Sequence, residues 1–193
     1  MINKRWLLFG FGLMAVGLVV GIGVGLTVPF PERELPERDV HASITIMQSI
    51  RGEHTLRVIF TNNTRVFLML VVGILTGGLL SLAEMLLIGY MIGLLVQIAQ
   101  IQGTPFIVTL AALLPHGVPE LTAFAAVGAL GIHLAFRVYR AAQGQSVDWW
   151  REVHVYGKLV LAAYGLLVAA AVIEAYVSPS LVAYFMRVTA KPL

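Results

Sequence analysis

Residues Leu113–Phe124 read LLPHGVPELTAF and lie inside an almost unbroken apolar run. One uninterrupted helix from Phe106 to Tyr139 would be about 50 Å long, whereas the hydrocarbon core of a membrane is only about 30 Å thick. Proline disfavours a continuing helix because it lacks the backbone N–H and crowds the preceding turn. We therefore expect a helix break in this stretch, at Pro115, Gly117 and Pro119.

This break divides the run into two helical pieces. Phe106–Leu114 is expected to form a proline-bounded half-helix of about 14 Å, either re-entrant or lying along the interface. Val118–Phe136 then forms a full span. In this scheme Gly117 caps the span, and Glu120 occupies its third position, where a carboxylate accepts hydrogen bonds from free backbone N–H groups.

The composition identifies a membrane protein. Of 193 residues, 59% are hydrophobic and only 12% are charged, against about a quarter charged in a typical soluble domain. The formal charge of +3 comes mostly from basic residues near span ends and gives no reason to expect nucleic acid as a partner. The absence of cysteine excludes disulfides, cysteine zinc sites and thiol nucleophiles.

The expected fold class is therefore all-α, a polytopic helical membrane protein with about five transmembrane helices plus the half-helix. We expect one integral membrane domain over 1–193, with a loop and an amphipathic interfacial helix at 29–61 and a helical core at 62–180. The numbers of basic residues on the two sides do not decide the orientation, but their clustering next to short span ends, as at Lys4 and Arg5, favours a cytoplasmic N-terminus in the cell membrane. The expected spans are Trp6–Val28, Asn63–Leu80, Leu82–Gln97, Val118–Phe136 and Leu159–Val177.

Two local patterns predict packing and capping. Gly17, Gly21 and Gly25 recur at every fourth residue of the first span, which gives a small-residue ridge for close contact with another helix. Ser81 followed by Glu84 fits a capping box at the start of the third span.

Polar residues are expected to gather near one membrane face. His116 and Glu120 are four residues apart, so both point to one side of a helix, and such a pair suits a metal ion or a proton. Strict alternation of the spans places further polar residues on the same membrane side, namely Asn62, Asn63, Arg65, Gln97, Gln100 and Glu174. Among them, Arg65 is a candidate counter-ion for Glu174. The cluster is either a hydrogen-bonded knot that fixes packing or a functional polar cavity, and both readings stay open.

Four motifs in this order resemble the stage II sporulation protein M family of integral membrane proteins. They are FTNNTRVFLMLVVGILTGG (Phe60–Gly78), LIGYMIG (Leu87–Gly93), LLPHGVPEL (Leu113–Leu121) and IEAYVSPS (Ile173–Ser180). The resemblance implies a helical membrane fold and singles out His116, Glu120, Glu174, Asn62 and Asn63. The resemblance implies, for the bacterial founder of the family, a scaffold that recruits cell-wall hydrolases. This chain departs from the family pattern at Ile88-Gly89, where the family usually has Asn-Gly, so no role of that asparagine carries over.

Three functional hypotheses remain. The first is a scaffold or assembly component without enzymatic activity, which associates with itself or with other membrane proteins through the glycine ridge and is surrounded by membrane lipids. The second is a transporter or channel for a small solute or ion through the polar cavity. The third is an intramembrane metal-dependent hydrolase using His116, Glu120 and Glu174. No HExxH, nucleophile motif, P-loop or GxGxxG is present, so an enzyme is less favoured and no cofactor is expected.

Overall fold

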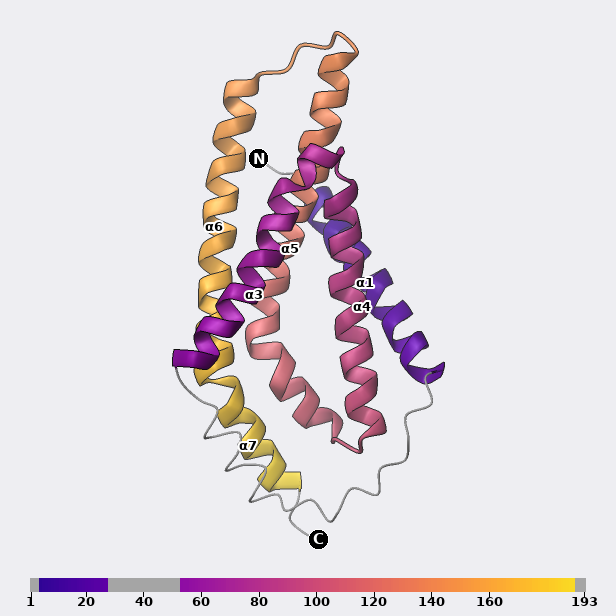
Figure 1. Cartoon of the computed structure of the whole chain (residues 1–193), viewed down its shortest axis with the longest axis vertical. Coiled ribbons are helices and arrows are strands. Elements are labelled where there is room, and N and C mark those ends of the chain that lie inside the picture. Colours follow the sequence, from indigo (N-terminus) through magenta and orange to yellow (C-terminus); the bar gives the residue numbers. More distant parts are fainter. Residues whose placement is uncertain (1–3, 28–52, 190–193) are drawn as a thin grey trace.

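The computed structural model describes residues 4–27 and 53–189. This part of the chain forms a helical bundle (Figure 1). Five of its helices are long and apolar enough to cross a membrane, which confirms the five predicted spans. The helices are α1 (Lys4–Thr27), α3 (Glu53–Val72), α4 (Leu79–Ile101), α5 (Phe106–Ala142), α6 (Trp149–Tyr176) and the short α7 (Ser178–Thr189).

The second span begins and ends earlier than predicted. α3 runs from Glu53 to Val72, followed by a 3₁₀ turn over Gly73–Thr76, so the end of the expected interfacial helix is the start of this span. The rest of that expected helix lies outside the described residues. Gly77 and Gly78 have φ of +65° and +86°, a conformation that glycine adopts readily, and they reverse the chain before α4.

Ser81 was wrongly predicted to be a helix cap. α4 begins at Leu79 with Gly78 as its N-cap. Ser81 is fully buried, and its hydroxyl donates a hydrogen bond of 3.0 Å to the carbonyl of Leu70 in α3. The tight glycine turn explains the error, because it presses the first turn of α4 against the end of α3.

Glycines from both partners line the contact between α1 and α4. A Cβ atom at Gly17 or Gly21 would collide with backbone oxygens of α4, and a Cβ atom at Gly89 or Gly93 would collide with backbone oxygens of α1. Gly25 continues the ridge and faces the side chain of Gln97. The ridge predicted from the sequence therefore packs within this chain, which leaves it covered rather than available to a second molecule.

α5 is one helix of 37 residues, and the predicted break at Pro115, Gly117 and Pro119 is wrong. Figure 1 shows α5 bent near its lower end. Pro115 and Pro119 lie inside this helix, and proline is a common cause of such a bend. Neighbouring elements explain the continuity, because α4, α6 and α7 all pack against α5 and hold the bent helix together. The excess length lies at the other end, where α5 and α6 extend above the other helices (Figure 1).

The interior is apolar and closely packed. Phe67 and Leu70 of α3, Met85 of α4, Val127 of α5 and Leu167 of α6 are the largest of its fully buried apolar side chains. Buried alanines are numerous on α5 and α6, and such small side chains let neighbouring helix backbones approach closely.

Replacing Gly21 with leucine should destabilise the protein by about 1–3 kcal/mol, because the new side chain would force α1 away from the backbone of α4. Gly23→Leu is the matched control, since Gly23 is exposed on the same helix with open space around it. Thermal unfolding in detergent measures both. Equal effects of the two changes, or an altered oligomeric state with unaltered stability, would contradict the intramolecular contact.

Candidate functional site

His116, Glu120 and Glu174 lie together beside the junction of α6 and α7; we call them the triad. His116 and Glu120 are one turn apart on α5, and Glu174 belongs to the last turn of α6. One potential ligand atom from each residue lies within 4.8 Å of the others. All three side chains are half-buried, so they are shielded yet not sealed from the surroundings.

The start of α7 orients the histidine. α6 ends at Tyr176, and α7 begins at Ser178, whose hydroxyl is buried 3.2 Å from Nδ1 of His116. Nε2 of His116 is then turned toward Glu174, with 3.9 Å between Nε2 and Oε2. This distance is too long for a hydrogen bond, so the histidine and the carboxylate face each other without a direct bond.

Glu120 occupies a different position from the one predicted. Because α5 continues through the prolines, Glu120 lies inside the helix, where no unpaired backbone N–H groups of a helix start are available to its carboxylate. Within the described residues its side chain makes no hydrogen bond or ion pair. Glu120 and Glu174 therefore place two carboxylates close together at membrane depth with little direct compensation.

The other predicted polar residues do not join the triad. Asn63 is buried at 7% exposure on the face of α3 that carries Phe67, and its Nδ2 has no hydrogen-bond partner in the described part of the chain. Asn62 and Arg65 are exposed, so Arg65 is not the counter-ion of Glu174. Gln97 lies against Gly25 of α1.

Gln100 likewise has another partner, since its side-chain amide donates a hydrogen bond of 3.2 Å to the hydroxyl of Thr109. Span alternation had put all of these residues on one membrane side. Alternation fixes the depth of a residue but not the direction in which its side chain points around the helix, which explains the mixed outcome.

A second charged group, near the C-terminal end of α5 and at the start of α6, was missed from the sequence. Glu152 lies 2.8 Å from Nε of Arg137 and 3.7 Å from Nε2 of His133, and the ring of Trp6 packs edge-on against His133. A cavity of about 260 Å³ adjoins this group. The sequence did offer a signal for this contact. The connection between α5 and α6 is short, so the two helices form a hairpin in which the end of α5 lies beside the start of α6.

Comparison with known proteins decides the family. The family model described as "Stage II sporulation protein M" matches residues 7–179. The chain belongs to the stage II sporulation protein M family. An uncharacterised protein of Methanocaldococcus jannaschii is 27% identical over 130 residues, which cover 66% of this chain and 73% of that protein. No solved structure matches this chain.

The family match includes all three triad residues and, together with the five apolar helices, shows that this member is a membrane protein. Ionisable groups inside a membrane span are costly, so we expect those of the triad either to bind something or to stabilise the fold. Stability measurements separate these two roles.

Glu120→Gln should leave the thermal unfolding temperature unchanged or raise it. The change removes a half-buried charge that lacks a hydrogen bond among the described residues and lies near a second carboxylate. Ser81→Ala serves as the comparison, because it deletes a buried hydrogen bond and should cost about 1 kcal/mol. If Glu120→Gln destabilises the protein as much as or more than Ser81→Ala, the triad is a structural knot.

Proposed function

We propose that this protein is a membrane transporter that binds a divalent metal cation at His116, Glu120 and Glu174. The observation that supports this proposal most strongly is the convergence of these three side chains within 4.8 Å on two membrane-spanning helices. A structural knot would be expected to satisfy its members with hydrogen bonds among themselves. Here the direct bond is the one between His116 and Ser178, and the two carboxylates remain available.

The donor set suits a divalent transition metal. An imidazole nitrogen and carboxylate oxygens bind Zn²⁺ at about 2.0–2.2 Å, and three protein ligands leave a coordination position open. Adjacent ligand atoms of a tetrahedral site are then about 3.3 Å apart, so the 3.9 Å between His116 and Glu174 requires only a small approach. Two carboxylates would also neutralise the charge of a divalent ion and favour its entry from water.

The hydrogen bond between Nδ1 of His116 and Ser178 has a role in this scheme, in which the ring N–H donates and the hydroxyl oxygen accepts. A histidine that ligates a metal through one ring nitrogen usually engages a partner through the other, which fixes the tautomer and the ring orientation. In His116, Nδ1 is hydrogen-bonded to Ser178, and Nε2 faces the carboxylate of Glu174. The bend of α5 supports a transport role as well, since distorted helices recur at the binding sites of membrane transporters.

We further propose that the N-terminus is cytoplasmic in the cell membrane, which places the triad near the external face. Basic residues at the end of the bundle opposite the triad support this orientation. They are Lys4, Arg5, Arg137, Arg140, Arg151 and Lys158. The scaffold hypothesis loses its expected route of association, because the glycine ridge is covered by α4. The hydrolase hypothesis uses the same ligands and differs only in the step after the metal has bound.

Cation binding and flux test the proposal. After treatment with a chelator, the parent protein should bind Zn²⁺ or Mn²⁺ in calorimetry, and affinity should fall on acidification because the ligands must lose protons. Glu174→Gln should weaken binding at least about tenfold by removing one ligand, whereas Glu84→Gln is the matched control on α4. Proteoliposomes containing a metal-sensitive dye should report uptake that Glu174→Gln abolishes.

Absence of binding by the parent, or equal binding by Glu174→Gln and Glu84→Gln, would overturn the cation site. Binding without uptake would exclude transport and leave the hydrolase hypothesis to be tested for proteolysis of membrane peptides.

A further inference from the structure

Arg65 carries a charge at the middle of a membrane span. It is the eleventh residue of the 22-residue span Thr55–Thr76, and its side chain is exposed on the outside of the bundle. Within the described residues it makes no ion pair or hydrogen bond. A charged side chain at the centre of a transmembrane helix costs about 2.5–3.5 kcal/mol on insertion scales, so an exposed arginine here indicates a missing partner.

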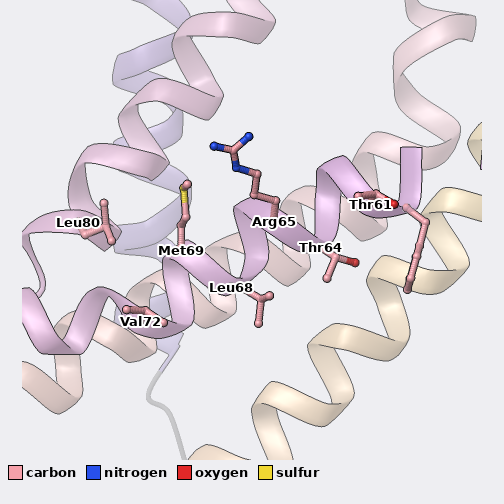
Figure 2. Close-up of a pocket in the computed structure, with 8 residues that line it drawn as sticks. Thr61, Thr64, Arg65, Leu68, Met69, Val72 and Leu80 are labelled. Carbon is pink, nitrogen blue, oxygen red and sulfur yellow. The ribbon is translucent and has the colours of Figure 1, made fainter. Parts of the chain in front are cut away.

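Arg65 opens onto a groove of about 510 Å³ on the surface of α3, shown in Figure 2. The groove runs along α3 from Phe60 to Val72, and Leu80 of α4 also lines it. Thr61 and Thr64 also line the groove, but the hydroxyl of Thr61 already donates a hydrogen bond of 2.8 Å to the carbonyl of Arg57, and the hydroxyl of Thr64 is buried within the protein. The groove therefore combines an apolar surface about three turns long with one charged side chain, that of Arg65, near its centre.

The depth of Arg65 identifies the chemistry of the occupant. About ten residues, or about 15 Å of helix, separate Arg65 from either end of its span. Phosphate headgroups lie outside the hydrocarbon core, about 15 Å from its centre. A carboxylate on another transmembrane helix reaches this depth directly, and a helix also fits the elongated apolar surface.

A second copy of this chain lacks the required carboxylate on its described surface. Glu120 and Glu174 belong to the triad, and Glu152 is paired with Arg137. Glu84 is half-buried in the second turn of α4, near a span end. None of these four glutamates is exposed at the middle of a described span, so among the described residues a second copy offers no carboxylate at the depth of Arg65, which favours a different protein as the partner.

We propose that the α3 groove, formed by the lining residues around Arg65, binds a transmembrane helix of another protein that carries one carboxylate near the middle of its span. Arg65 pairs with the carboxylate, and Leu68 and Val72 pack against the apolar side chains of the bound helix. This association is independent of cation binding at the triad, which lies on α5 and α6.

A synthetic transmembrane helix tests the proposal. The chain has no cysteine, so Gln145→Cys in the turn between α5 and α6 allows a single fluorescent label. Energy transfer in phosphatidylcholine vesicles would measure binding of an acceptor-labelled Leu/Ala helix with one central glutamate, and of the same helix with glutamine. The labelled chain should bind the glutamate helix at least about tenfold more tightly.

Arg65→Gln should abolish this preference, whereas Arg57→Gln should retain it, because Arg57 is exposed on the same helix but does not line the groove. Leu68→Trp, which fills the groove, should weaken binding of both helices. Equal binding of the two helices by the parent, or a preference that survives Arg65→Gln, would overturn the proposal. So would an anionic lipid that copurifies with the parent and is lost with Arg65→Gln, since the occupant would then be a lipid.

Discussion

A charged or polar side chain inside a membrane is costly unless it is compensated, and this constraint indicates where the molecule needs a ligand or a partner. Glycines and alanines build the framework, because small residues let helix backbones approach closely without any polar contact. Ionisable groups within the described spans then concentrate at a few positions. The triad lies at the C-terminal end of α6 and within the N-terminal half of α5, the pair of Arg137 and Glu152 lies near the turn that joins these two helices, and Arg65 lies on the outside of α3.

The contact between α1 and α4 changes which surface can serve for association. A ridge of glycines on a first span resembles an association surface when only the sequence is known. The structure shows Gly17 and Gly21 covered by the backbone of α4, whose own Gly89 and Gly93 return the contact. Any association with other membrane proteins is therefore expected to use a different surface. We propose the α3 groove, where the charge of Arg65 indicates a partner that carries a carboxylate.

The sequence predicted the framework better than its details. Long apolar runs predicted five spans, and those spans are present, because length and hydropathy alone define a membrane helix. The spacing of His116 and Glu120 also indicated that both face one side. Pro115 and Pro119 misled the prediction, since tertiary contacts hold a bent helix together where an isolated helix would end. The other polar residues do not reach the triad, because each helix is rotated so that their side chains point elsewhere. No local sequence pattern reveals this rotation.

The proposed function depends above all on the triad being a metal-binding site whose histidine is oriented by Ser178. X-ray absorption spectroscopy of the Zn²⁺-loaded protein at the zinc edge tests this most directly. We expect one imidazole nitrogen and carboxylate oxygens at about 2.0–2.2 Å, with the imidazole signal absent after His116→Gln. A spectrum of the hydrated ion, or one that is unchanged by His116→Gln, would contradict it.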